Sequence, residues 1–231
     1  MEAKGPLPTS PIEGENRIIQ EHFLERNTKE SIYFGGNEKF ILEKDRILSV
    51  PFGESNSNET FKFITGLNPD MVILYGCSII KPLLLSYYDK KVLNLHLGLS
   101  PYYRGAGTNF WPLVNREPEC VGATIHVPIL TVDAGPILLQ ARPPMEFTDS
   151  CHDIGCKAII AGTNMMIKGI NLHFGGKIQP EFQKPRGKLY KNKDFNAEAV
   201  VKMLKNFASN MIGEYLDNKS LRDKKHPIIE R

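Results

Sequence analysis

Asn94, His96 and Asp133 are the residues of this sequence whose types and spacing could carry out chemistry. Asn94 and His96 lie two positions apart in a run with the pattern of a strand, so their side chains point to one face and can meet a single ligand atom. Asp133 begins a tight Asp-Ala-Gly turn that would present its carboxylate to an open site. The three groups suit acyl transfer, although Asn and His at strand ends more often cap backbone groups, and spacing alone leaves both roles open.

The elements that would position these residues alternate between strands and helices. Residues 71–75 (MVILY) form the β-branched and apolar run typical of a strand buried on both faces. Residues 79–88 favour a helix, and residues 91–96 (KVLNLH) follow as a second strand after a segment long enough for a right-handed crossover. The pattern predicts an α/β fold, a doubly wound and mostly parallel sheet that binds ligands at the carboxyl ends of its strands.

Further elements are predicted around this pair. They are helices over 13–26, 58–66, 108–117, 150–174 and 196–216, and strands over 46–51, 121–127 and 136–141. The long helix begins with a capping box at Ser150 and Asp153, and its glycines at 155, 162 and 169 favour close packing on a sheet. The last helix is amphipathic and packs either on the domain or on a second subunit of a homodimer.

We expect three segments along the chain. Residues 1–12 contain three prolines and form an irregular arm, residues 13–176 form the α/β domain, and residues 177–231 form a C-terminal helical extension. No apolar run with the pattern of a strand precedes the helix predicted over 13–26, so the first strand of the sheet is expected to be absent.

Composition limits the class of protein. A net charge of +3 over 231 residues, with one short basic run at Lys224 and Lys225, gives no reason to expect a nucleic-acid partner. No stretch approaches the roughly 20 apolar residues of a membrane span. The four cysteines, without a secretory leader, indicate reduced thiols and a soluble cytoplasmic protein.

A metal site is not expected. Cys151-His152 and Cys156 offer ligand atoms, but the second pair of sulfurs that a closed zinc site needs is missing from the sequence pattern. These residues are therefore predicted to be ordinary parts of the long helix.

Two segments carry a family resemblance: NLHLGLSPYYRG (94–105) and TVDAGPILLQ (131–140). They resemble the signature of the folate-dependent formyltransferases, a family that includes glycinamide ribonucleotide, methionyl-tRNA and amino-sugar N-formyltransferases. The likeness extends from about Ile47 to Gly169. It implies that Asn94, His96 and Asp133 are catalytic and that 10-formyltetrahydrofolate is the formyl donor.

The resemblance also implies a mechanism. An unprotonated amine attacks the formyl carbon, and the Asn94 amide and a protonated His96 stabilise the charge on the formyl oxygen. Asp133 orients and stabilises the imidazolium and takes the proton that leaves the amine. Neither a metal nor a covalent enzyme intermediate is required.

Two walls of a folate pocket are implied as well, one at residues 75–80 and one at residues 127–132. The donor-binding residues implied are Tyr75, Gly76, Cys77, Ser78, Ile79, Val127, Ile129, Leu130, Thr131 and Val132. Four residues in or after the loop that follows His96 are candidates for contacts with the acceptor, although an ordinary surface-loop role is open for each. They are Tyr102, Tyr103, Arg104 and Asn109.

Differences between this sequence and the family pattern bear on which amine accepts the formyl group. Residues 1–16 lack the glycine-rich turn that holds the phosphate of glycinamide ribonucleotide, and the segment after Gly176 is too short for the basic β domain that binds tRNA. Gly98 and Leu130-Thr131 also differ from the common residues, which affects pocket shape. A small amine remains as the acceptor. In this respect the sequence is most similar to enzymes that formylate a nucleotide-linked amino sugar. The alternative from another class is a non-catalytic folate-binding or interaction relative, which the missing strand favours and the retained Asn94, His96 and Asp133 disfavour.

Overall fold

The computed structural model describes residues 1–35, 43–176, 179–184 and 187–230. Its central sheet has the order β1-β2-β4-β5, formed by β1 (Val72–Tyr75), β2 (Val92–His96), β4 (Ala123–His126) and β5 (Ile137–Ala141). β1 and β2 are parallel, whereas β4 is antiparallel to both β2 and β5. A separate parallel pair joins β3 (Tyr103–Gly105) to β6 (Lys188–Tyr190). The predicted α/β fold is confirmed, and its pairings are of both kinds.

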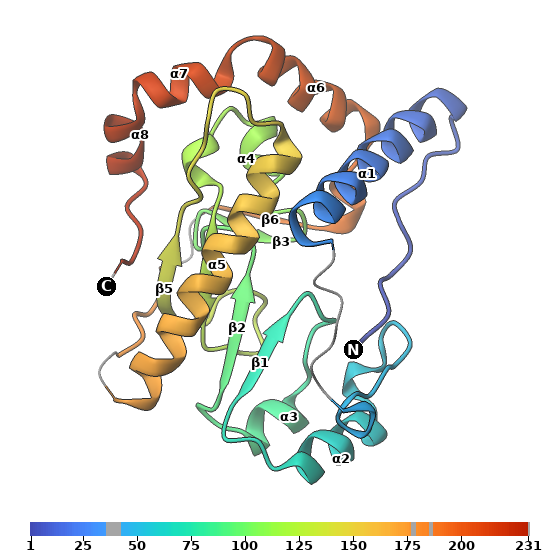
Figure 1. Cartoon of the computed structure of the whole chain (residues 1–231), viewed down its shortest axis with the longest axis vertical. Coiled ribbons are helices and arrows are strands. Elements are labelled where there is room, and N and C mark those ends of the chain that lie inside the picture. Colours follow the sequence, from blue (N-terminus) through green and yellow to red (C-terminus); the bar gives the residue numbers. More distant parts are fainter. Residues whose placement is uncertain (36–42, 177–178, 185–186, 231) are drawn as a thin grey trace.

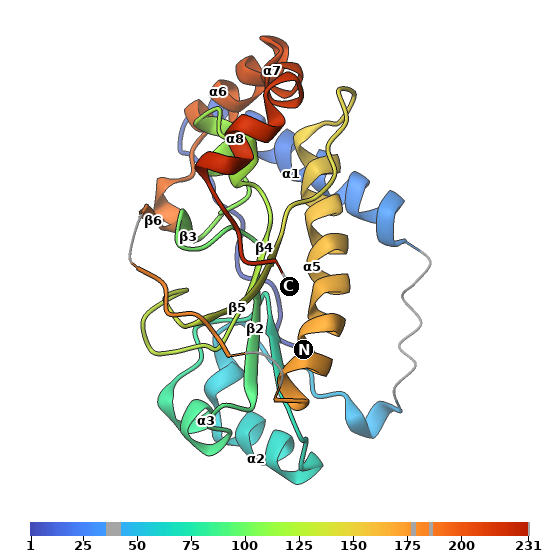
Figure 2. The ribbon, with the colours of Figure 1, turned by 90° about the vertical axis from the view of Figure 1, so that its left-hand side faces the viewer.

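Helices lie on both faces of the sheet (Figures 1 and 2). They are α1 (Glu13–Phe34), α2 (Asn58–Leu67), α3 (Pro82–Tyr87), α4 (Trp111–Val114), α5 (Cys151–Phe174), α6 (Ala197–Ala208), α7 (Met211–Asp217) and α8 (Lys219–Lys225). Short 3-10 turns are η1 (Lys44–Arg46), η2 (Glu54–Asn56), η3 (Pro118–Cys120) and η4 (Asn192–Asp194). α5 covers one face, and side chains of α2 and α3 pack with β1 on the other. Within the described ranges, no helix has the length and apolar character needed to cross a membrane.

Alternation along β2 and β4 gives the sheet one apolar and one polar face. Leu93 and Leu95 of β2 pack in one buried cluster with Ile125 of β4 and with methionines of α5. The residues between them, Asn94 and His96, point to the opposite face, as the strand period requires. The α5 contact therefore fixes which way the polar side chains of the sheet point.

The predicted capping box at the start of α5 is confirmed. Ser150 Oγ accepts from the Asp153 N–H at 3.2 Å, and Asp153 Oδ2 accepts from the Ser150 N–H at 3.0 Å. These bonds satisfy backbone donors that have no partner inside the helix.

Ser150→Ala should therefore lower the free energy of unfolding by about 1 kcal/mol, the usual cost of losing such a cap. Urea unfolding followed by circular dichroism measures the change. Thr163→Ala is the matched control, because the Thr163 hydroxyl bonds only to the Ile159 carbonyl within α5. An equal effect of both substitutions would contradict the capping role.

Several predicted boundaries are wrong. α1 continues to Phe34, beyond the predicted end at residue 26, while α4 is confined to Trp111–Val114. The strand predicted over 46–51 is instead η1 followed by a single bridge between Val50 and Glu2. Val50 makes both bonds of this bridge, donating to the Met1 carbonyl and accepting from the Ala3 N–H at 2.8 Å each.

The helix predicted over 196–216 is divided into α6 and α7. Asn210 lies between them with φ +62°, a left-handed conformation that asparagine tolerates better than most residues. Both helices pack on this chain's own core, where Met203, Met211 and Tyr215 share a buried cluster with Trp111. Figure 1 shows α6, α7 and α8 across one end of the fold, above α4.

Candidate active site

The structure brings Asn94, His96 and Asp133 together and adds His126 to them. Asn94 and His126 face each other in the β2–β4 register, and Asn94 Nδ2 lies 2.9 Å from His126 Nε2. His96 Nδ1 lies 3.5 Å from Asp133 Oδ1, and His126 Nε2 lies 3.7 Å from the same oxygen. The result is a compact group of two imidazoles, a carboxamide and a carboxylate on the polar face of the sheet.

His126 is a residue that the sequence interpretation missed. The strand Ala123–His126 carries the signal, because Thr124 and His126 alternate with the apolar Ala123 and Ile125. Period-2 alternation of this kind places His126 on the polar face beside Asn94. With Asn94 Nδ2 as donor, His126 accepts the hydrogen bond and holds the amide in one orientation.

Asp133 is held by contacts from two other parts of the chain. The Gly105 N–H donates to its carboxylate Oδ2 at 2.9 Å, which ties the turn to the loop after His96. The Gln183 side-chain amide donates to the Asp133 carbonyl at 2.9 Å and to the Gly135 carbonyl at 2.5 Å. Because side chain and backbone are both bonded, the carboxylate has a fixed position relative to His96.

Burial determines the charge of His96. It lowers the pKa of His96, and nearby His126 lowers it further, while Asp133 and a hydrogen bond with the Tyr103 backbone oppose the change. The net direction is downward from the ordinary value, so the imidazole is neutral at neutral pH. The predicted protonated His96 therefore requires that the ring gain a proton during the reaction.

The environment of Asp133 favours its charged form. Burial raises the pKa of this carboxyl, but the neighbouring imidazoles of His126 and His96 and the Gly105 N–H together lower it below the ordinary value. At neutral pH the site thus pairs a carboxylate with a neutral His96.

The free nitrogen of His96 faces the space beside Gly98. His96 Nε2 is buried and has no hydrogen-bond partner among the residues that the structure describes. A Cβ atom at position 98 would lie 2.8 Å from Nε2 and 2.6 Å from the Thr108 side chain. Gly98, which differs from the common residue of the family pattern, therefore leaves room next to His96 Nε2.

The predicted donor wall at residues 75–79 lies at the end of β1, next to β2. Tyr75 pairs with Leu95, so its side chain points toward the α5 face, away from Asn94 and His96. The Ser78 N–H and hydroxyl both donate to the Glu2 carboxylate of the N-terminal arm, at 2.7 Å each. The other three residues are Gly76, with φ +59°, the half-buried Cys77 and the exposed Ile79.

The opposite predicted wall is a loop that leaves β4 and returns through Asp133 to β5. Ile129 is 46% exposed and Leu130 is 64% exposed, and Ile79 of the first wall is 67% exposed. Val127 and Val132 are half-buried and Thr131 is exposed. Solvated apolar side chains on both loops suit a flat aromatic ligand, but the binding roles of these ten residues remain predictions.

The loop after His96 is anchored by its own aromatic residues. Tyr103 is buried and its hydroxyl bonds to Glu117, and the Tyr102 hydroxyl donates to the Pro227 carbonyl at 2.8 Å. Trp111 stacks on Tyr190 with ring centroids 4.4 Å apart. The Trp111 indole N–H donates to the loop at the Ala106 carbonyl, at 3.1 Å.

The two remaining candidates for contacts with the amine acceptor, Asn109 and Arg104, differ in their hydrogen bonds. Asn109 Oδ1 accepts from the Gly122 N–H at 2.9 Å, which is a structural contact. Arg104 is half-buried in β3, and its Nε lacks a hydrogen-bond partner within the described part of the chain. Asn109 Nδ2 is likewise a buried donor without a partner among the described residues, so both side chains keep an unused donor, and Arg104 is the one that carries a charge.

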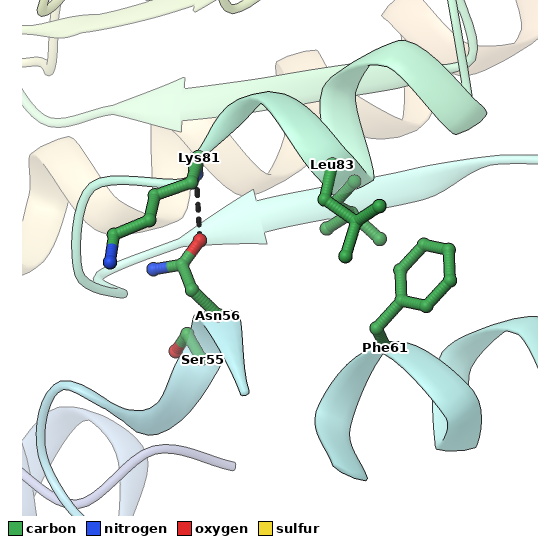
Figure 3. Close-up of a pocket in the computed structure, with 6 residues that line it drawn as sticks. Ser55, Asn56, Phe61, Lys81 and Leu83 are labelled. Carbon is green, nitrogen blue, oxygen red and sulfur yellow. Dashed lines mark hydrogen bonds between the residues drawn. The ribbon is translucent and has the colours of Figure 1, made fainter. Parts of the chain in front are cut away.

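A separate small pocket lies between η2, α2 and α3 (Figure 3). The backbone N–H of Lys81 donates to Asn56 Oδ1 at 2.6 Å across one side of it. Its volume of about 20 Å³ has room for about one water molecule, far below the ~300–1,000 Å³ of a ligand pocket. This pocket is therefore too small to be a substrate site.

The formyl transferase family model matches residues 39–170, more than half of the chain. The chain belongs to the formyl transferase family. A GDP-perosamine N-formyltransferase of Brucella melitensis is 36% identical over 112 residues, which cover 47% of this chain and 43% of that protein. The phosphoribosylglycinamide formyltransferase of Escherichia coli is 35% identical over 102 residues, covering 44% and 48%. The chain thus spans about half the length of the curated relatives it matches.

Solved structures of formyltransferases share the fold. One is the formyltransferase PseJ from Anoxybacillus kamchatkensis in complex with UDP-4,6-dideoxy-4-formamido-L-AltNAc and tetrahydrofolate. It has a TM-score of 0.54 and 24% identity, and the match covers 63% of this chain and 75% of that one. A sugar N-formyltransferase from a Shewanella species has a TM-score of 0.53 and 17% identity, with 78% and 75% covered.

Proposed function

We propose that this chain transfers the formyl group of 10-formyltetrahydrofolate to a primary amine, that of a nucleotide-linked amino sugar. The observation that carries the proposal is the joining of Asn94, His96 and Asp133, through His126, into one group on the polar face of the sheet. Membership of the family supports the reaction. The similarity to a GDP-perosamine N-formyltransferase supports the acceptor class.

The proposed mechanism begins with a neutral His96. A ring proton on Nδ1 faces Asp133, which leaves the lone pair of the unpartnered Nε2 free to accept a proton as the amine attacks the formyl carbon. The resulting imidazolium is stabilised by the Asp133 carboxylate. It then lies beside the developing oxyanion, to which the second N–H of the Asn94 amide can also donate.

The bound donor supplies the formyl carbon and leaves as tetrahydrofolate. The tetrahydrofolate nitrogen that carried the formyl group takes up the proton that His96 accepted from the amine. The residues that would hold it are the exposed apolar side chains Ile79, Ile129 and Leu130 with the main chain of 76–79, and these suit a flat ring. Arg104, with an unpartnered buried Nε, is the candidate for contact with an anionic acceptor.

The test is release of tetrahydrofolate when the full chain is incubated with 10-formyltetrahydrofolate and separate amines. The panel comprises dTDP-, UDP- and GDP-linked amino sugars, glycinamide ribonucleotide and methionyl-tRNA. Turnover with an amino sugar supports the proposal, and turnover with only one of the other two would assign the acceptor to that class. Folate binding without turnover on any amine would instead support the non-catalytic alternative. Cytoplasmic location and a homodimer remain predictions.

The lowered pKa of His96 predicts how kcat depends on pH. Between about pH 6.5 and 8, kcat should stay level or rise, because the ring is already mostly neutral and the amine loses its proton as pH rises. Steady-state rates at saturating substrate measure this. A fall in kcat with its midpoint inside that range would mean that the resting imidazolium is required.

A further inference from the structure

A second group of chemically capable side chains lies where α1 crosses the start of α5. His22 of α1 meets Cys151 and His152 of α5, and one nitrogen or sulfur atom of each lies within 4.8 Å of the others. The two imidazole rings have centroids 4.7 Å apart. None of these three residues has a part in the proposed formyl transfer.

The two helices supply these residues by a simple geometry. α1 packs against α5, as Figure 1 shows, and Cys151 and His152 form the first turn of α5 after the Ser150 cap. Glu25 follows His22 by three positions on α1 and therefore shares its face. The Glu25 carboxylate lies 3.8 Å from His152 Nε2, so a fourth potential ligand lies beside one of the three.

His152 is not satisfied by its surroundings. Its side chain is buried, with 8% relative exposure for the residue, and its Nε2 has no hydrogen-bond partner among the described residues. Leaving a buried polar nitrogen unpaired is costly, which favours a ligand for it.

We propose that His22, Cys151 and His152 bind one divalent ion of the zinc class, with Glu25 as the fourth ligand, and that this ion fastens α1 to α5. Two imidazoles, a thiolate and a carboxylate are ligands that Zn²⁺ accepts in a tetrahedral site. The metal–sulfur bond forms as Cys151 releases its thiol proton to solvent. Small side-chain rotations bring the ligand atoms to the ~2.0–2.3 Å that such bonds require.

An aromatic packing role would account for part of the cluster. The His22 ring also contacts Phe23, Phe110 and Phe195, as a core histidine would. Packing alone, however, gives no partner to His152 Nε2 and no use for the neighbouring sulfur. The sequence pattern predicts no metal because the sulfurs of a closed zinc site are missing near Cys151, whereas the additional ligands come from a distant helix.

Co²⁺ added to the metal-free full chain provides a direct test. We expect one equivalent to bind, with the visible bands of a tetrahedral ion and a sulfur-to-metal charge-transfer band. The charge-transfer band should be lost in Cys151→Ala and kept in Cys156→Ala, whose thiol lies on the same helix. In competition with a chromophoric chelator, His152→Gln and His22→Gln should weaken Zn²⁺ binding by at least the ~10–100-fold that loss of an outer-shell partner costs.

A second measurement uses the unaltered chain and so does not depend on the variants folding. Zn²⁺ should slow alkylation of Cys151, identified by mass spectrometry, and slow amide exchange in α1. Binding that is equal in Cys151→Ala and wild type, or no effect of Zn²⁺ on Cys151 alkylation, would overturn the proposal. Neither readout involves formyl transfer, so the two proposals fail separately.

Discussion

An Asp133→Asn protein is expected to fold normally and to transfer formyl groups roughly 10²–10⁴-fold more slowly than the wild type. Asparagine tolerates the left-handed conformation of this position, where φ is +49°, so the turn should survive. The loss concerns chemistry, because a neutral amide cannot stabilise the positive charge that His96 acquires. His96→Ala should have an effect of similar size.

The rate is measured by single-turnover release of tetrahydrofolate, after circular dichroism has shown an unchanged fold. Asp217→Asn, a solvent-exposed carboxylate at the end of α7, is the matched control and should retain wild-type turnover. Near-normal turnover by Asp133→Asn would remove this carboxylate from the mechanism, while leaving the family assignment intact.

Gly162→Val should lower the free energy of unfolding by about 1–3 kcal/mol, the usual cost of overpacking a core. Gly162 lies where α5 approaches the sheet closely: an added Cβ would lie 2.8 Å from the Ala123 Cβ and 3.0 Å from a Leu95 methyl. A valine would have to push the helix away from β2 and β4. The polar face of those strands carries Asn94 and His96, so turnover should fall as well.

Gly155→Ala is the matched comparison on the same helix and should have the opposite sign. Nothing lies within 4 Å of a Cβ at position 155, so alanine adds helix propensity of about 1 kcal/mol without a clash. Chemical denaturation of both variants measures the difference. Destabilisation by both would show that the regular glycine spacing has a role other than contact with the sheet.

The parts of the fold that the sequence predicted are those with strong local signals. The apolar run of β1 and the Ser150 capping box act over neighbouring residues, and both elements start within one residue of the expected position. The end of α1 and the break at Asn210 depend on packing between distant segments. Glycines 162 and 169 contact the sheet as expected, whereas nothing lies within 4 Å of a Cβ at Gly155.

Three residues of the candidate site were predicted, but His126 and the electrostatics were not. Strand period and turn chemistry made Asn94, His96 and Asp133 candidates, and the family resemblance joined them in one site. The charge of His96 depends on burial, which comes from the whole fold and has no local pattern. The Gln183 bonds to the Asp133 turn are likewise tertiary, since no periodicity links residues so far apart.

Trp111 is the only tryptophan in the sequence, so this chain has a single strong fluorophore. The indole is buried, stacks on Tyr190 of β6 and donates to the Ala106 carbonyl, next to the glycine that bonds Asp133. Its emission therefore reports on the loop that joins the site to the β3–β6 pair. Titrations of donor or acceptor can be followed by the emission of this one residue, without a label.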